Sequence, residues 1–167
     1  IDGEAILSDY RKKTRTSGSS SINIEKNYDT GQWEAKIPQS DITQLLSVKD
    51  TNGDTITTWF EFEDGTTDNL YDWATLVLKP AYIENGEPTV SKDGAAWPLT
   101  VTYNYFSHSG YGPLFVNSYT HDDSNIDFDD IPVYTSKQTG NFYPLNTCID
   151  CRPIRHSDGT IEFSWSI

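Results

Sequence analysis

Short runs of β-branched and aromatic residues recur along the chain from residue 20 onward, and Gly, Asn, Asp and Pro separate them. In TITTWFEFE (55–63), alternation places Ile56, Phe60 and Phe62 on one face of an extended segment. Successive side chains of a β-strand point to opposite faces, so this period of two predicts strands that bury one side. The same pattern in LTVTYNYF predicts a core strand over 98–107.

The pattern predicts an all-β domain, an antiparallel β-sandwich of immunoglobulin- or fibronectin-like type with long ordered loops. Residues 121–130 and 136–158 are predicted to be those loops, because they lack a strand pattern. The predicted strands are 20–26, 32–37, 43–49, 55–63, 74–79, 98–107, 113–120, 131–135 and 160–166.

One segment, SDITQLLSV (40–48), fits two interpretations. Ser40 or Asp41 could cap a helix in which Ile42, Leu45 and Leu46 share a face. The following VKDTNGDTIT contains an Asn-Gly pair, which favours a tight hairpin turn. A strand that ends at this turn is the preferred interpretation.

The chain is expected to comprise a flexible arm or linker, residues 1–19, and a β-rich domain, residues 20–167. The arm carries the basic run RKKTR (11–15) beside TSGSSS, a composition typical of a solvated segment. The sequence starts with Ile1 and closes on IEFSWSI, which resembles an interrupted strand. We therefore expect it to be a fragment of a longer chain.

Charge disfavours several classes of partner. Twelve basic and twenty-five acidic residues give a net charge of −13. Nucleic acids and anionic membranes are polyanions, so neither is an expected partner. No run approaches the roughly 20 apolar residues of a membrane-spanning helix.

Two acidic segments have some features of metal sites. Residues 50–61 place Asp50, Asn52, Asp54 and Glu61 at the liganding positions of a calcium loop. The glycine, however, stands at position 4 instead of position 6, so a plain hairpin turn is preferred. The second segment is a cluster of carboxylates that could hold calcium or magnesium but is better read as a solvated acidic loop: Asp122, Asp123, Asp127, Asp129 and Asp130. No metal and no cofactor is predicted.

Cys148 and Cys151 form CIDC, the spacing of a thioredoxin-like redox pair. Pro153 follows closely and no helical pattern surrounds the pair, so free or buried thiols are the expected state. The sequence has no nucleophile elbow, phosphate loop or HExxH motif, and nothing selects a pair of carboxylates for glycoside hydrolysis. No catalytic residue and no enzymatic activity is predicted.

The stretch DGTTDNLYDW (64–73) is predicted to be an architectural turn. Asp64 and Gly65 suit a tight turn, and Asp68 and Asp72 can accept hydrogen bonds from backbone N–H groups. Tyr71 and Trp73 are expected to pack inward.

Three stretches resemble a module of virion structural proteins of large tailed bacteriophages, notably T4-like phages of marine cyanobacteria. They are FEFEDGTTDNLYDWATLVLKP, LTVTYNYFSHSGYGPLFVNSY and DDIPVYTSKQTGNFYPLNTCIDCRPIR, and the match spans residues 40–155. The chain departs from the pattern at Asn117, at Cys151, where an aromatic is usual, and at Ile154. The matching positions are Phe60, Phe62, Asp64, Gly65, Asp68, Tyr71, Asp72, Ser118, Tyr119, Ile131, Pro132, Tyr134, Asp150, Arg152, Pro153 and Arg155.

The resemblance implies a non-enzymatic virion domain of a phage tail, baseplate or fibre-associated protein. Its implied partners are other virion proteins and further copies of itself in a symmetric assembly. An alternative hypothesis is a glycan-binding module for host attachment. The aromatic residues that could stack on sugars are Trp33, Trp59, Trp97 and Tyr111.

Arg152 and Arg155 flank Pro153 in a very acidic chain. A guanidinium stays charged and its planar fork matches a carboxylate. We expect at least one of the two to pair with a carboxylate of the 64–72 turn or of the 122–130 loop.

Overall fold

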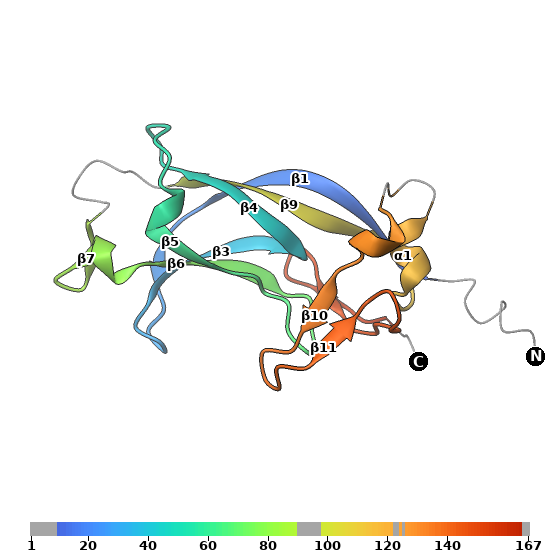
Figure 1. The fold of residues 1–167 in the computed structure, drawn as a ribbon. Helices are drawn as coiled ribbons and strands as arrows, with labels where there is room; N and C mark the ends of the chain where they lie inside the picture. The colour runs from blue at the N-terminus through green and yellow to red at the C-terminus, as the bar shows by residue number, and fades with distance from the viewer. Residues whose placement is uncertain (1–9, 90–97, 122–123, 125, 165–167) are drawn as a thin grey trace, which may run out of the picture.

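Two antiparallel sheets form the main body of the computed structural model, which describes residues 10–89, 98–121, 124 and 126–164 (Figure 1). The first sheet has the order β1-β9-β4 and the second the order β2-β3-β6-β5. The first consists of β1 (Lys12–Ile22), β9 (Leu99–Ser109) and β4 (Ile42–Lys49). The second consists of β2 (Glu25–Lys26), β3 (Trp33–Ser40), β6 (Trp73–Leu78) and β5 (Phe60–Glu63).

Shorter elements complete the described chain. Three two-stranded ribbons pair β7 (Ile83–Glu84) with β8 (Glu87–Pro88), β10 (Val133–Thr135) with β11 (Phe142–Pro144), and β12 (Ile154–Arg155) with β13 (Ile161–Glu162). The helical elements are α1 (Val116–Thr120) and the 3-10 turns η2 (Thr57–Trp59), η3 (Pro80–Tyr82) and η5 (Phe128–Asp130). Within the described residues, no helix has the length and apolar character needed to cross a membrane.

The main hydrophobic core receives side chains from both sheets. Leu99, Val101 and Tyr103 of β9 are buried in it, as the alternation in the sequence predicted. Ile37 of β3 and Leu76 of β6 enter it from the second sheet. The all-β class is therefore confirmed, whereas the immunoglobulin- or fibronectin-like topology remains a prediction.

The prediction of a flexible arm is wrong for residues 12–19. These residues belong to β1, which pairs with β9 in continuous register from Lys12 opposite Ser109 to Ile22 opposite Leu99. The inward positions of β1 include Gly18, where an added Cβ would lie 3.0 Å from the Tyr105 ring. The aromatic rings of β9 thus pack directly on the β1 backbone. The pairing could not be recognised in the sequence because β1 has almost no apolar side chains. Residues 1–9 lie outside the described part.

Two other predicted strands are partly replaced by helical turns. Residues 57–59 of the predicted strand 55–63 form η2, and β5 begins only at Phe60. Residues 116–120 of the predicted strand 113–120 form α1, because the Ser118 hydroxyl accepts the Phe115 N–H at 3.0 Å and closes a helical turn. Both segments have strand-forming composition, and local hydrogen bonding overrides it.

The remaining expectations hold in outline. Residues 42–49 form strand β4 and not a helix, and the chain turns at 50–54, with the Gly53 N–H bonded to the Asp50 carbonyl oxygen at 3.1 Å. The expected loop 136–158 also contains β11 and β12. The predicted strand 160–166 is represented by β13, and its end lies outside the described residues.

Gly65 should be the least replaceable glycine of the 64–73 turn. A Cβ there would fall well inside contact distance of the Trp73 and Asp72 carbonyl oxygens, which belong to the backbone and cannot move aside. Gly65→Ala should lower the free energy of unfolding by about 3 kcal/mol. The control is Gly31→Ala, where φ is 74° and no atom lies within 4 Å; there we expect about 1 kcal/mol from the backbone alone. Equal urea midpoints for the two variants would contradict this packing argument.

Candidate functional site

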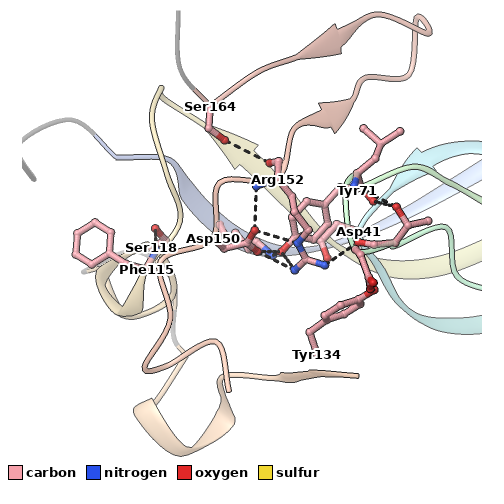
Figure 2. A network of polar contacts seen from close by, with 12 residues as sticks. Asp41, Tyr71, Phe115, Ser118, Tyr134, Asp150, Arg152 and Ser164 are labelled. Atoms are coloured by element: carbon pink, nitrogen blue, oxygen red, sulfur yellow. Dashed lines mark hydrogen bonds and ion pairs between the residues drawn. The ribbon is translucent and has the colours of Figure 1, made fainter. Parts of the chain in front are cut away.

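Three of the residues that carry the resemblance, Tyr71, Asp150 and Arg152, belong to a largely buried polar network at one end of the two main sheets, here called the joint (Figure 2). Its members come from the start of β1, the β3–β4 corner, the 64–72 turn, the end of β9 and the segment 150–155. The joint consists of Lys13, Asp41, Tyr71, His108, Asp150 and Arg152.

The Tyr71 hydroxyl is the centre of the joint. It accepts hydrogen bonds from Lys13 Nζ at 3.1 Å and from Arg152 Nη2 at 2.8 Å. It donates its own proton to Asp150 Oδ2. Tyr71 is only 2% exposed, so these three bonds replace the water that its hydroxyl loses on folding.

The Arg152 guanidinium contacts a carboxylate, a backbone carbonyl oxygen and two aromatic rings. Its Nε and Nη2 contact the two Asp150 carboxylate oxygens at 2.9 and 2.8 Å, a bidentate pair. Its Nη1 donates to the Thr67 carbonyl oxygen at 3.1 Å. The guanidinium carbon lies 4.3 Å from the ring centroid of Tyr71 and 4.2 Å from that of Tyr134, so two aromatic rings contact it.

Lys13 and Asp41 form the second buried ion pair. Lys13 Nζ lies 2.8 Å from Asp41 Oδ2, and the same oxygen lies 2.6 Å from His108 Nε2. A carboxylate only accepts, so His108 carries its proton on Nε2. Asp41 has a φ of 55°, a conformation that Asp tolerates better than most residues. Aromatic rings surround the Lys13 ammonium, with centroid distances of 4.4 Å to Tyr71, 4.9 Å to Tyr119 and 5.3 Å to Phe106.

A more open group of contacts adjoins the joint. Arg155 Nε lies 2.7 Å from Asp72 Oδ1, which confirms the expectation that one of the two arginines pairs with the 64–72 turn. Asp68 accepts hydrogen bonds from the Tyr134 hydroxyl at 2.6 Å and from the Ser136 hydroxyl at 2.8 Å. The turn is therefore bonded both to the segment 150–155 and to the region of β10.

Burial and ion pairing act against each other in the pKa values of the joint. Burial alone would raise the pKa of Asp41, but the Lys13 ammonium and the His108 hydrogen bond outweigh it and hold the pKa at about 2. Burial lowers the pKa of His108 to about 4, against the effect of Asp41. Burial also raises the pKa of Tyr71 well above its ordinary value. At neutral pH the joint thus contains charged Lys13, Asp41, Asp150 and Arg152 with neutral His108 and Tyr71.

Some buried polar atoms of the described residues lack a hydrogen-bond partner. They are His108 Nδ1, the Tyr119 hydroxyl, Asn146 Oδ1, and Nε and Nη1 of Arg11. Arg11 is 1% exposed, and its Nη2 is 3.5 Å from the Ser164 hydroxyl. Together with buried Lys13, this overturns the interpretation of the basic run 11–15 as a solvated arm.

The other motif residues take structural positions. Ser118 and Tyr119 are buried in α1, where Tyr119 packs edge-on against Phe106. Asp64 is exposed and pairs with Lys137 at 3.3 Å. A groove of about 500 Å³ beside the joint is lined by Asp68, Tyr134, Tyr143, Ile149 and Arg152, among others. Cys148 and Cys151 also line this groove as free thiols.

Three of the four residues proposed to stack on sugars lie in the described part of the chain. Trp33 and Trp59 are half-buried against the main core, and the Trp59 ring stacks on Tyr82 with a centroid distance of 4.8 Å. Tyr111 is 78% exposed. Trp97 lies outside the described residues.

The acidic segments show turn contacts in the described part. Asp50 Oδ1 accepts the Asp54 N–H at 2.9 Å, as in an ordinary turn. Asp127, Asp129 and Asp130 are exposed around η5, whereas Asp122 and Asp123 lie outside the described residues. No group of three or more His, Cys, Asp or Glu residues in the described ranges is placed to hold a metal ion.

Comparison with protein-family models, with curated proteins and with solved structures gave no match. The joint must therefore be interpreted from its own geometry.

Sequence reasoning found Tyr71, Asp72, Arg152 and Arg155 but missed Lys13, Asp41 and His108. A lysine within a basic run and an aspartate at a turn carry no sequence signal of burial.

Arg152→Ala should destabilise the fold because it leaves the buried Asp150 carboxylate without its cation and removes one partner of Tyr71. We expect the free energy of unfolding to fall by about 3 kcal/mol. Lys137→Ala, which breaks the exposed pair with Asp64, serves as the control and should change it by less than about 1 kcal/mol. Urea unfolding of both variants measures the difference, and similar midpoints would show that the joint does not stabilise the domain.

His108 should make the domain less stable in mild acid. The pKa of His108 is lowered to about 4 in the folded state, from an ordinary value of 6.5. Between pH 6.5 and about pH 4, the histidine is therefore protonated in the unfolded chain but not in the folded one. The free energy of unfolding should fall by up to about 3 kcal/mol as the pH drops through this window. His108→Gln keeps an N–H donor for Asp41 but cannot titrate, so this part of the pH dependence should disappear. An unchanged slope in the variant would exclude His108 as its source.

Proposed function

We propose that this chain is a non-enzymatic structural domain of the virion of a large tailed bacteriophage, in the tail, the baseplate or a fibre-associated protein. Its function is to hold protein–protein contacts during and after assembly. The resemblance of residues 40–155 to such a module motivates the proposal.

The proposal is supported by the observation that several motif residues bond to one another. Tyr71, Asp150 and Arg152 engage one another inside the protein, and Asp72 engages Arg155. The polar groups of Tyr71 and Asp150 are already bonded away from solvent, so these residues are poorly placed to act on a substrate. The role of these motif residues is to bond the 64–72 turn to the segment 150–155, which is distant in the sequence.

Exposed apolar side chains near β10 and β11 offer a contact surface. Val133 is 54% exposed, Phe142 72%, Tyr143 44% and Ile149 64%. Tyr143 and Ile149 line the groove beside the joint, whereas Val133 and Phe142 lie on the other face of the β10–β11 ribbon, because side chains alternate along a strand. Exposed aromatic side chains of this kind are enriched at protein interfaces. We name these four residues the apolar surface.

The joint and the apolar surface are physically connected. Tyr134 of β10 contacts the Arg152 guanidinium with its ring and Asp68 with its hydroxyl. Ser136, directly after β10, bonds to the same carboxylate. The surface is therefore held before a partner arrives, which reduces the entropy lost on binding.

The proposal predicts that mass spectrometry of purified particles detects this chain and that a map of the intact particle contains its fold. Phe142→Asp together with Ile149→Asp should leave stability within about 0.5 kcal/mol, because both side chains are exposed. The same change should abolish incorporation of the protein into particles. Tyr28→Asp, at a side chain that is 87% exposed elsewhere, is the control and should incorporate normally. Particles that lack the chain altogether would refute the proposal.

A further inference from the structure

The first sheet has two outer edges that differ in regularity. On one side, the pairing of β4 with β9 shifts register between Ile42 and Gln44 and again between Leu45 and Ser47. The chain after β4 also folds back on it, since the Ile56 N–H bonds to the Val48 carbonyl oxygen at 2.8 Å. Irregular pairing and covering chain are the usual protection of an edge strand against further pairing.

The edge formed by β1 lacks this protection. Its eleven residues pair with β9 without any register shift, and no described strand pairs with its other side. β1 contains no proline. Such a long and regular edge is suited to pairing with another strand.

A hydrogen bond at the N-terminal end of β1 identifies the backbone groups that face outward. The Lys13 carbonyl oxygen bonds to His121 Nε2 at 2.7 Å, and His121 is not part of β9. In an antiparallel strand, the N–H and C=O of one residue point to the same side, and sides alternate along the chain. The outward groups are therefore those of Arg15, Ser17, Ser19 and Ser21.

Charge distinguishes the β1 edge from the rest of this acidic molecule. The chain carries a net charge of −13, yet residues 10–24 contain no Asp or Glu and include Arg11, Lys12, Lys13 and Arg15. Two copies that approach each other elsewhere meet with like charge, which is unfavourable. At the middle of β1, the exposed side chains are the uncharged Ser17, Ser19 and Ser21.

We propose that the β1 edge pairs with the β1 edge of a second copy, antiparallel and about a two-fold axis at Ser17. Ser17 then faces Ser17 of the second copy, and Arg15 faces its Ser19, so no like charges are opposed. Two three-stranded sheets would join into one sheet of six strands. This inference stands on the strand edge and does not depend on the virion role.

The first test is the oligomeric state of the wild-type domain. One strand pair buries little area, so we expect a dissociation constant on the order of 0.1 mM. Sedimentation equilibrium at up to about 1 mM protein should detect a dimer. Added salt should strengthen it, because at about 0.1 M the Debye length is near 10 Å and the overall repulsion is screened. A monomer at every concentration would overturn the proposal.

The second test uses complementary charges at the two-fold axis. Ser17→Lys alone and Ser17→Glu alone should each be monomeric, because each places like charges opposite each other. An equal mixture of the two variants should restore the dimer, and a fold defect in the single variants could not produce that rescue.

Ser47→Lys and Ser47→Glu are the matched controls. Ser47 is bonded to Thr102 at 2.6 Å on β9, much as Ser17 is bonded to Asn104 at 2.8 Å, but Ser47 lies on β4. Both Ser47 variants should dimerise as the wild type does. If the Ser17 mixture stays monomeric, or if the Ser47 variants lose the dimer equally, pairing at the β1 edge is wrong.

Discussion

The hydroxyl group of Tyr71 is the point on which the remaining contacts of the joint depend. It links Lys13 of β1 with Arg152 and Asp150 of the C-terminal segment, and Lys13 in turn reaches Asp41 at the corner between β3 and β4. Lys13, Asp41 and Asp150 are buried and Arg152 is largely so, and each is compensated by a neighbour, so removal of one member leaves another charge without a partner. Segments far apart in the sequence therefore fix one another's positions.

The distribution of charge explains why an acidic chain concentrates cations near its N-terminus. Arg11 and Lys13 are each 1% exposed, and Lys13 offsets the buried Asp41 carboxylate. Burying Asp41 without this ammonium would carry the full cost of an isolated charge. Most of the remaining acidic residues lie on the surface, where water solvates them. Arg11 and Lys13 of the basic run thus belong to the interior, whereas Lys12 and Arg15 are exposed.

Alternation of apolar and polar residues predicted strands correctly where one face of the strand is buried. β3 and β9 bury alternate apolar side chains in the main core, whereas β6 is buried at five consecutive positions and β4 was found from the turn that follows it. β1 was missed because its core-facing positions include Gly18, where the rings of Tyr103 and Tyr105 supply the apolar contact from the neighbouring strand, and because Lys13, buried on its other face, is charged. The Arg155–Asp72 pair could be anticipated from charge, as both residues belong to a recognisable motif. Lys13, Asp41 and His108 could not, because only the folded chain brings three separated polar residues together.

Exposed and buried ion pairs differ in how firmly they fix the chain segments that they join. An exposed pair such as Lys137–Asp64 can break and re-form in water at little cost, so it transmits almost no constraint. A buried network cannot open in part, because a half-open state exposes neither charge to enough water to solvate it. The turn at 64–72 and the C-terminal segment, which the buried network joins through Tyr71, Asp150 and Arg152, should therefore stay together or separate together. The Tyr134 ring contacts the Arg152 guanidinium of this unit, so the cooperativity would also fix the position of β10 relative to the two sheets, as the assembly role that we propose requires.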